Sequence, residues 1–499
     1  MIDLAAVGDA LGLLGSNPMA WIVVPIGLLI GLVFGVLPGL SVPIAMAVFL
    51  PFTLHMDFLS AILFLTAIFT GGGFGGSVPA ILMNVPGTTA AIATCFDGYP
   101  MARQGRHNEA IGMALAASTV GTVIGYTLLL IILEPISRFV LQLGAPEMVL
   151  IAVAGLFLIA VLAGGYFVRA IIAGGIGLLI GTMGMSSSGV MRGTMDSMYM
   201  LDGIETTAAI IGLFAASEIF ALTRNDYIVS NSEARKVRLA SIASGFAHAF
   251  RRWGLMIRGG LIGSLIGTVP GVGSTVANLV SYASARATSK SADTFGKGNP
   301  DGVIAAESAN SSSEGGSMVT LLALGIPGGA GTAIMLGAFA MHNVTGGPRF
   351  ISDNKDVVYA IIGGNLVQAI LLAIMGILFL RIAVMVVQVP LRYLLPVILV
   401  LTVLGSYALS GNMVGPVTLA GGAILGLIMK HFNYPIVAIV IGLLLANLLE
   451  GNLLRTYQLS RGDFTIFFER PICIALIIII VLAAVLPAVT RRIKARRPA

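Results

Sequence analysis

Residues 35–41 read GVLPGLS, and residues 75–89 read GGSVPAILMNVPGTT. About 230 residues later the same order returns, with GTVPGVGST at 267–275 and GGSMVTLLALGIPGGAGT at 315–332. In each copy a Pro-Gly pair interrupts an apolar run, a Gly-Gly-Ser triplet follows, and a second Pro-Gly comes about a dozen residues beyond the start of that triplet. Matching helix breaks in the two halves of a hydrophobic chain indicate a transporter with internal repeats and a binding site near the middle of the membrane.

The composition is that of a membrane protein. Of the 499 residues, 57% are hydrophobic and only 10% are charged, whereas soluble domains carry about 25% charged residues. Long apolar runs, such as 357–380 and 471–489, are close to the ~20 residues that cross a bilayer as a helix. We therefore expect an all-α polytopic membrane protein with roughly 12 transmembrane segments, counting the broken ones.

Basic residues divide the chain into four expected parts. These are an N-terminal membrane repeat (1–222), a basic linker or amphipathic arm (223–258), a C-terminal membrane repeat (259–490) and a basic tail (491–499). The linker and the tail hold clusters of Lys and Arg, so both are assigned to the cytoplasm. Residues 231–253 mix basic with apolar residues, which fits either an amphipathic helix bracing one half against the other or a solvated linker.

The loops of the two copies carry opposite charge patterns. After the first break, loop 52–57 has no Lys or Arg, whereas its counterpart 284–300 has three. After the second break the bias reverses: the first copy has Arg103 and Arg106, while the bases within 349–356 are offset by aspartates. Equivalent loops are therefore expected on opposite sides of the membrane, which predicts two inverted repeats containing broken helices or re-entrant hairpins.

The broken helices are the expected binding site. Proline removes a backbone donor and glycine permits unusual conformations, so backbone groups are freed at each break. In hydrocarbon such groups are tolerated only where protein, water or ligand satisfies them. Helix N-termini favour anions, and exposed oxygens suit a hard cation.

Small polar residues near the breaks provide the candidate ligands. The residues predicted to bind an anionic substrate are Ser41, Asn84, Pro86, Gly87, Thr88, Thr89, Ser274, Thr275, Asn310, Ser311, Pro327, Gly328 and Gly329. The residues predicted to hold a coupling ion, with Na⁺ as the metal, are Gly39, Ser77, Asn278, Ser312, Ser313, Glu314 and Thr332. For any single Ser or Thr, a hydrogen bond back to its own helix explains the residue equally well.

Three carboxylates require separate consideration. Glu307 and Glu314 are seven residues apart, hence on one face if the helix continues, and either could carry a proton or help bind a cation. The alternative is that Glu307 braces a helix and Glu314 is solvated at a loop tip. Asp97, within DGYP, is expected to form a turn rather than to touch a ligand.

Several motifs are absent. The sequence has no GxxxxGK[ST], no HExxH and no GxSxG, and its five histidines and two cysteines form no ligand cluster. We therefore expect neither P-loop ATP hydrolysis nor another enzymatic activity, and no cofactor apart from the coupling ion. The net charge of +6 is accounted for by loop topology, so no nucleic-acid partner is expected.

The motifs resemble those of a known family, the large membrane subunit of the tripartite tricarboxylate transporters. The matching stretches, spread from residue 35 to about residue 350, are GVLPGL, GGGFGGSVPAILMNVPGTTAAIATCFDGYPMARQG, LDGIETTAAIIGLFAASE, GTVPGVGST, FGKGNPDGVIAAESAN and LALGIPGGAGTAIMLGAF. Two positions depart from the family's pattern. Asn310 is followed by Ser311 instead of a second asparagine, and residues 346–348 are Gly-Gly-Pro instead of Pro-Gly-Pro.

The resemblance implies a secondary transporter of the bacterial inner membrane that works with a small membrane subunit and a periplasmic solute-binding protein. It implies uptake of di- or tricarboxylates driven by a Na⁺ or H⁺ gradient. We expect alternating access, with one repeat-derived bundle moving against the other in an elevator-like manner, and loops 52–57 and 343–356 facing the binding protein. Two alternatives remain open: the permease of an ATP-driven importer, and the membrane subunit of a Na⁺-translocating decarboxylase.

Overall fold

The structure is a computed structural model that describes residues 3–37, 41–140, 143–162, 167–186, 190–194, 198–201, 203–217, 238–270, 273–386 and 391–481. Within these residues the regular structure is helical, as expected, apart from a two-stranded antiparallel sheet of β1 (Gly184–Met185) and β2 (Met191–Arg192). Gly39, the first part of the expected linker and the basic tail lie outside the described residues.

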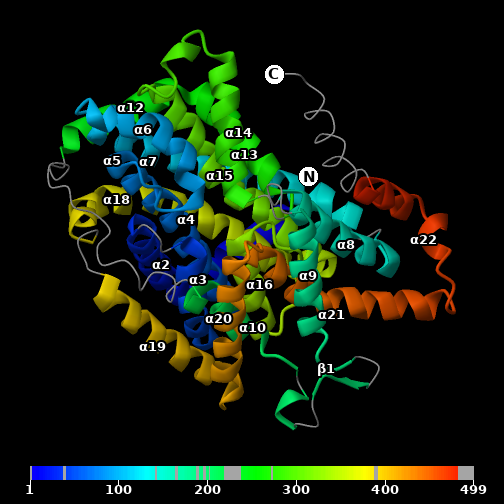
Figure 1. Cartoon of the computed structure of the whole chain (residues 1–499). Coiled ribbons are helices and arrows are strands. Elements are labelled where there is room, and N and C mark those ends of the chain that lie inside the picture. Colours follow the sequence, from blue (N-terminus) through cyan, green and yellow to red (C-terminus); the bar gives the residue numbers. More distant parts are fainter. Residues whose placement is uncertain are drawn as a thin grey trace, which may run out of the picture.

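The elements of the first half, ending at residue 217, are coloured from blue to green in Figure 1. They are α1 (Leu4–Ser16), α2 (Pro18–Val36), α3 (Val42–Phe49), the 3-10 helix η1 (Leu50–His55), α4 (Phe58–Gly75), α5 (Ser77–Met83), the 3-10 helix η2 (Thr89–Ala91), α6 (Ile92–Arg103), α7 (His107–Val140), α8 (Ala145–Leu162), α9 (Phe167–Gly181), the 3-10 helix η3 (Met198–Met200), α10 (Thr206–Ile211) and the π-helix η4 (Gly212–Ala216).

The second half begins at residue 238. Its elements are α12 (Leu239–Arg251), α13 (Trp253–Gly267), α14 (Gly273–Thr288), the 3-10 helix η6 (Ala292–Thr294), α15 (Pro300–Leu324), α16 (Ala330–Met341), α17 (Pro348–Asp353), α18 (Lys355–Val386), α19 (Leu391–Ser410), α20 (Val414–His431), α21 (Ile436–Leu459) and α22 (Ile466–Glu469).

Six helical segments among the described residues are long and apolar enough to cross a membrane. They are Pro18–Val36, Phe58–Met83, His107–Ile132, Lys355–Arg381, Val414–His431 and Ile436–Leu459. Shorter apolar helices accompany them, for example Trp253–Gly267 and Ala330–Met341. A multi-pass helical membrane protein is thus supported, while the count of roughly 12 segments stays a prediction.

In the first half, α2 packs along α4 through glycines. A Cβ on Gly31 would lie 2.2 Å from the carbonyl oxygen of Ile68, and a Cβ on Gly35 would lie 2.5 Å from that of Gly72. Because both contacts advance by four residues in the same direction, the two helices are parallel. Small residues allow such close backbone approach between membrane helices.

The second half repeats this pairing with α13 and α15. A Cβ on Gly263 would lie 2.2 Å from the carbonyl oxygen of Ala309, and a Cβ on Gly267 would lie 2.3 Å from that of Ser313. These helices are also parallel. The glycine that precedes each first Pro-Gly break therefore makes the same kind of contact in both halves.

The helices α4 and α15 cross each other in opposite directions at the centre of the molecule. Thr70 of α4 donates a hydrogen bond to Glu314 of α15, with an Oγ1–Oε2 distance of 2.8 Å. Three residues further along α4, the Gly73 carbonyl accepts a bond from Asn310 Nδ2 at 3.4 Å, four residues back along α15. The corresponding helices of the two halves are thus antiparallel.

Each of these central helices also packs on a long helix of the other half. A Cβ on Gly125 of α7 would lie 2.6 Å from the carbonyl oxygen of Ser312 on α15. In the same way α18 packs on α4, where a Cβ on Gly376 would lie 3.2 Å from the ring of Phe74. Each half of the chain therefore supplies a long helix that packs on the central helix of the other half.

The Gly-Gly-Ser triplet has different structures in the two halves. In the first half α4 ends at Gly75 and α5 starts at Ser77, whereas in the second half α15 continues through residues 315–317. The difference follows from Pro79, which has no N–H to donate to the helix one turn earlier, whereas the equivalent Val319 donates normally. The polar run 310–314 accordingly lies inside one continuous, buried helix and not at a loop tip.

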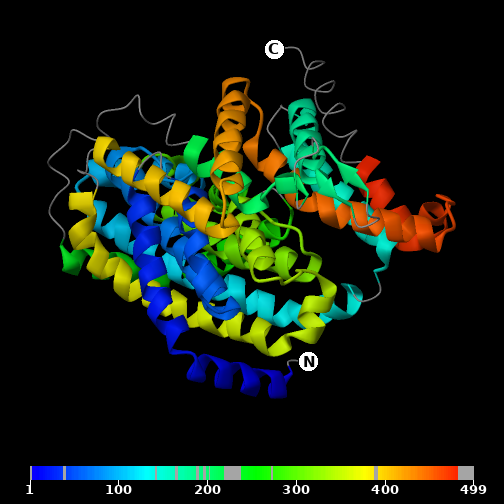
Figure 2. The same ribbon diagram turned by 90° about the horizontal axis from the view of Figure 1, so that it is seen from below.

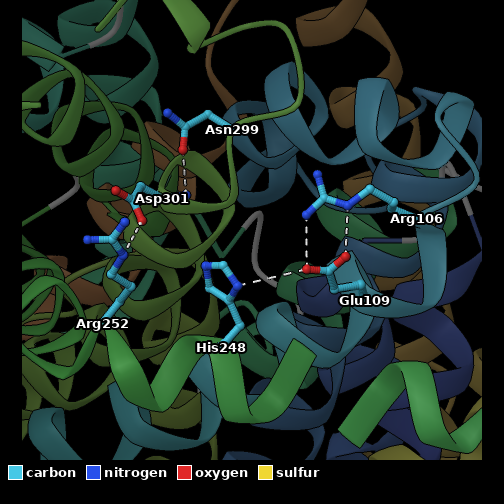
Figure 3. Close-up of polar contacts among 6 residues, drawn as sticks. All are labelled: Arg106, Glu109, His248, Arg252, Asn299 and Asp301. Atoms are coloured by element: carbon cyan, nitrogen blue, oxygen red, sulfur yellow. Dashed lines mark hydrogen bonds and ion pairs between the residues drawn. The ribbon is translucent and has the colours of Figure 1, made fainter. Parts of the chain in front are cut away.

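A group of charged side chains from both halves lies near the start of α15 (Figure 3). Arg106 Nε pairs with Glu109 Oε2 at 2.8 Å, and His248 Nδ1 of α12 lies 3.9 Å from Glu109 Oε1. Beside them Arg252 Nε lies 3.2 Å from Asp301 Oδ1, at the start of α15. The Asp301 amide is in turn capped by the side chain of Asn299, the N-cap residue of α15.

The loops in which Lys and Arg are absent or offset by aspartates, 52–57 and 343–356, meet at the C-terminal end of α15. His342 Nε2 lies 3.1 Å from the carbonyl oxygen of Thr53, and the ring of Phe58 packs edge-on against that of Phe350. Leu322, near the end of α15, accepts a bond from the Gly347 amide at 3.2 Å. With 25 residues, α15 separates the two groups of loops by about 37 Å.

Within the expected linker, the described residues form α12 and the start of α13. Helix α12 lies against α7, where a Cβ on Gly112 would lie 2.2 Å from the carbonyl oxygen of Ile242. The buried residues of α12, Ile242, Gly245 and Ala249, share one face, as in an amphipathic helix. The expected boundary at residues 258/259 falls inside α13, and the division of the chain into four parts stays a prediction.

Other helices surround the core. In Figure 1, α8, α9, α21 and α22 lie to one side, and in Figure 2 the N-terminal α1 lies along the lower edge of the molecule. Helix α9 packs tightly against α21, where a Cβ on Gly177 would lie 2.0 Å from the carbonyl oxygen of Ile439.

The close approach of α13 and α15 predicts that Gly263→Val destabilises the protein. The added side chain would overlap Ala309 and Ser312 of α15, and such overpacking costs about 1–3 kcal/mol or more. A lower melting temperature of the purified protein in detergent would show this. Gly254→Val is the matched control on the same helix, because a Cβ there meets nothing within 4 Å; equal losses in both variants would contradict the prediction.

Candidate substrate and cation site

The second break has the same backbone form in both halves. Asn84 ends α5 with φ 58°, and Gly325 ends α15 with φ 68°, both left-handed. Each is followed two residues later by the proline of the Pro-Gly pair, and a new helix begins a few residues beyond. Left-handed capping followed by proline is a common way to end a helix sharply.

Each second break packs against the first break of its own half. The Gly87 amide donates to the Gly76 carbonyl at 3.1 Å, and a Cβ on Gly87 would lie 2.1 Å from the carbonyl oxygen of Gly35. A Cβ on Gly328 would lie 2.9 Å from the carbonyl oxygen of Gly267, the equivalent residue. The two breaks of each half therefore pack on each other, a contact that the sequence analysis did not predict.

The broken segments also contact the opposite half. Helix α14, after the first break of the second half, packs on η2 and α6, and Thr275 Oγ1 donates to Thr89 Oγ1 at 3.0 Å. Helix α3, after the first break of the first half, packs on α16. The helix starts themselves are adjacent: a Cβ on Gly329, before α16, would lie 3.5 Å from the Cα of Gly273, and a Cβ on Gly72 of α4 would lie 2.5 Å from Val42, the first residue of α3. With Thr89, just before α6, bonded to Thr275, the starts of α3, α6, α14 and α16 lie around the crossing of α4 and α15.

The residues predicted to bind substrate are spread over this region with different exposures. Gly87, Thr88, Asn310, Ser311, Pro327 and Gly328 are buried, Ser41, Pro86, Ser274, Thr275 and Gly329 are half-buried, and Asn84 and Thr89 are exposed. Thr88 Oγ1 forms no hydrogen bond with any described residue. Because the set contains no Lys or Arg, an anion here would be held by backbone N–H groups, hydroxyls and amides.

Most residues predicted to hold the coupling ion already bond to the backbone. Thr332 Oγ1 accepts from the Gly329 amide and donates to its carbonyl, both at 3.0 Å. Ser312 and Ser313 donate to carbonyls one turn back on α15. Asn278 accepts from the Ala93 amide and donates to the Ala306 carbonyl. For Ser312, Ser313 and Thr332 these bonds lie within the residue's own helix or its N-cap, whereas Asn278 links α14 to α6 and α15.

Ser77 and Glu314 remain from that set. Ser77 Oγ is buried and forms no hydrogen bond with a described residue. Glu314, 3% exposed, accepts bonds from Thr70 and from Tyr126, whose hydroxyl lies 2.8 Å from Oε1. Gln368 Nε2 of α18 donates to Thr70 Oγ1 at 2.7 Å, which extends this network to a fourth helix.

The second carboxylate, Glu307, lies two turns earlier on the same face of α15. It is fully buried and accepts hydrogen bonds from Thr94 of α6 and, at 3.2 Å, from Ser118 of α7. Neither Glu307 nor Glu314 forms an ion pair within the described part of the chain. Buried charges without such a partner are costly and mark functional positions in membrane proteins.

Asp97 has a structural role that the sequence did not indicate. Instead of forming a turn it lies inside α6, buried, and Oδ1 accepts bonds from the amides of Gly296, Gly298 and Asn299 at 2.8–2.9 Å. Oδ2 accepts from the Tyr282 hydroxyl at 2.9 Å. One carboxylate of the first half thereby fixes the loop that leads into α15 of the second half.

Sequence reasoning missed the partners of the carboxylates. Thr70, Tyr126 and Gln368 come from the three helices α4, α7 and α18, and Thr94 and Ser118 come from α6 and again from α7. The one available signal was a polar residue inside an apolar run, as with Gln368 within 357–380.

Comparisons with known proteins agree with these features. The model of the family described as "Tripartite tricarboxylate transporter TctA family" matches residues 21–441. The chain is 32% identical over 468 residues, 93% of each chain, to an "Uncharacterized 52.8 kDa protein in TAR-I ttuC' 3'region" of Agrobacterium vitis. It is 32% identical over 230 residues to an "Uncharacterized protein in TAR-II ttuC' 3'region" of the same organism, covering 46% of this chain and 95% of that one. No solved structure matches.

The contacts of Asp97 predict that Asp97→Ala loosens the loop at residues 296–299. Three backbone amides and one hydroxyl lose their acceptor, and the loss of such bonds to a charged group should cost about 3 kcal/mol or more in total. Faster hydrogen exchange at residues 296–299 and a lower melting temperature would show it.

The control for this prediction is Asp293→Ala, an exposed aspartate in the adjoining η6. It should leave both measurements unchanged. Unaltered exchange at residues 296–299 in Asp97→Ala would show that the carboxylate does not hold the loop.

Proposed function

Because the chain belongs to the tripartite tricarboxylate transporter TctA family, we propose that it takes up di- or tricarboxylates across the bacterial inner membrane by coupling to a Na⁺ or H⁺ gradient. In this proposal a small membrane subunit completes the transporter, and a periplasmic solute-binding protein delivers the substrate. The observation that carries the proposal is the convergence of four helix starts, lined by neutral donors, around the crossing of α4 and α15.

The two halves are inverted repeats in this proposal. The support is that α4 and α15, which lead into equivalent motifs, run antiparallel. Repeats related by an axis along the membrane normal would place equivalent helices parallel. The matching contacts of Gly35 with Gly87 and of Gly267 with Gly328 further support a common origin for the two halves.

The substrate lies between the breaks, near the midpoint of the core. Carboxylates would accept hydrogen bonds from the starts of α6 and α16 and from the hydroxyls of Thr88, Thr89 and Thr275. Helix N-termini favour negative charge, and hydrogen bonds to a carboxylate are about twice as strong as those between neutral groups. This arrangement binds an anion without a fixed positive charge, which eases release on the other side.

The orientation follows from the loops at the two ends of α15. The end with the Arg106, Glu109, His248 and Arg252 contacts faces the cytoplasm by the positive-inside rule. The opposite end, where 52–57 meets 343–356, then faces the periplasm and receives the binding protein.

Alternating access in this proposal moves the cores of both repeats together. Movement of one repeat-derived bundle against the other fits poorly, because α14 packs on α6 and α3 packs on α16 across the halves. Separating the halves would break these contacts, including the bond from Thr275 to Thr89. The peripheral group of α8, α9 and α21 is the better candidate for the static part.

Uptake into proteoliposomes that contain the purified subunits should require a Na⁺ or H⁺ gradient. Citrate and other radiolabelled di- and tricarboxylates are the substrates to test, with the binding protein added outside. Accumulation that persists after both gradients are collapsed would contradict the coupling. ATP dependence with a soluble ATPase partner would instead identify an importer permease, and substrate consumption without accumulation would identify a decarboxylase subunit.

Replacing Pro86–Gly87 or Pro327–Gly328 by Ala-Ala should abolish uptake. A Cβ at Gly87 or Gly328 cannot fit against Gly35 or against Ser317, so the broken segment must shift and the site is lost. The control is Pro396→Ala, an exposed proline inside α19, which should transport normally. Normal uptake by both Ala-Ala variants would show that the Pro-Gly breaks are not part of the substrate site.

A further inference from the structure

The buried Glu307 lies where elements of both halves meet. Thr94 of α6 and Ser118 of α7 donate to its two carboxylate oxygens. Ser77 of α5 and Asn310, one turn further along α15, lie close enough to influence the same carboxylate. Four elements and both halves therefore contribute to one small cluster.

The cluster is made of oxygen-bearing side chains and has no cationic partner. Thr94, Ser118 and Ser77 are 0% exposed, and Asn310 is 4% exposed. No Lys, Arg or His of the described residues pairs with Glu307. A buried carboxylate that receives hydroxyl donors on both oxygens is suited to being charged, and that charge requires compensation.

Ser77 supplies an independent observation. Its hydroxyl is fully buried and lies near the Glu307 carboxylate, yet Oγ has no hydrogen bond of normal length and angle to any described residue. Buried hydroxyls in proteins almost always have a partner, so an orphan points to a missing ligand. Several buried serines of this core bond to their own helix, as Ser312 and Ser313 do, and Ser77 does not.

We propose that a Na⁺ ion binds between the Glu307 carboxylate and the side-chain oxygens of Ser77, Thr94 and Ser118, with Asn310 at the edge of the site. This inference rests on the proposed function and assigns its coupling ion a position. Carboxylate, hydroxyl and amide oxygens are the ligands of hard cations. The site differs from the set of coupling-ion residues predicted from the sequence. Of that set only Ser77 is a ligand here, and the charged ligand is Glu307 instead of Glu314.

The surroundings favour Glu307 over Glu314 for this ion. Glu314 is held by Thr70 and Tyr126, and Thr70 accepts in turn from Gln368, so that network is closed by protein donors. The Glu307 cluster retains an unused hydroxyl. If Glu307 carried a proton instead of binding Na⁺, that proton would need only one acceptor. The lack of a hydrogen-bond partner for Ser77 Oγ would then stay unexplained.

The position of Ser77 links the ion to the substrate site. Ser77 follows Gly76, whose carbonyl accepts from Gly87 at 3.1 Å and whose Cα lies against Thr88. An ion bound to Ser77 therefore fixes the segment that carries the second break of the first half. Filling the cation site would pre-order the substrate site, which is the basis of positive coupling.

The test measures Na⁺ binding without substrate. The purified protein is melted in detergent over a series of NaCl concentrations, with choline chloride keeping the ionic strength constant, and KCl serves as the specificity control. Na⁺ should raise the melting temperature of the wild type in a saturable manner. Glu307→Gln should weaken the apparent Na⁺ affinity by about tenfold or more, since removal even of groups that orient metal ligands costs about 10–100-fold.

Ser77→Ala keeps the proposal testable if Glu307→Gln fails to fold. Ser77 Oγ bonds to no described residue, so its removal should leave the melting temperature without Na⁺ unchanged and weaken the Na⁺ response. Ser308→Ala is the matched control: this buried hydroxyl adjoins Glu307 but bonds to the Ala305 carbonyl of its own helix. The control should bind Na⁺ as the wild type does.

Three results of this binding test would overturn the inference. The first is a wild type whose melting temperature responds to pH but not to Na⁺. The second is an unchanged Na⁺ affinity in both Glu307→Gln and Ser77→Ala. The third is loss of Na⁺ binding in Glu314→Gln with retention in Glu307→Gln. Na⁺-driven uptake that survives Glu307→Gln would refute this site while leaving the proposed function intact, whereas gradient-independent uptake by the wild type would refute the function itself.

Discussion

The antiparallel contact between α4 and α15 is the interaction on which the rest of the structure depends. At that crossing Thr70 meets Glu314 and the Gly73 carbonyl meets Asn310. Backbone and carboxylate groups buried in hydrocarbon must find partners inside the protein, and here the partners come from the opposite half. The crossing therefore holds the halves together and concentrates polar groups at one depth.

The packing of helices from one half on helices of the other half follows from this crossing. Once α4 and α15 lie across each other, α7 packs on α15 and α18 packs on α4, so each half completes the surroundings of the other. The broken segments are fixed in the same manner, with Asp97 holding the loop before α15 and α16 resting on α3. A structural unit of this protein is thus composed of pieces from both halves of the sequence.

The sequence allowed the prediction of a helical membrane fold and of the helix breaks, because Pro-Gly pairs act locally on the backbone. The loops that their charges assign to opposite membrane sides meet in two groups at opposite ends of α15, while the sides themselves stay a prediction. It did not predict that the polar run 310–314 lies in a continuous helix, since polarity alone resembles a loop. The partners of Glu307, Glu314 and Asp97 were missed because they come from helices distant in sequence, and no local pattern encodes such contacts.

The hydrogen bonds that Asp97 accepts from residues 296–299 have a consequence for the order in which the protein assembles. Thr70, Thr94, Asp97 and Ser118 are synthesised in the first half, but the groups that satisfy them belong to a segment translated about 200 residues later. Until α15 is present, the first half lacks the partners that these groups have in the folded protein. The polar core of the first half is therefore completed only when the second half packs against it.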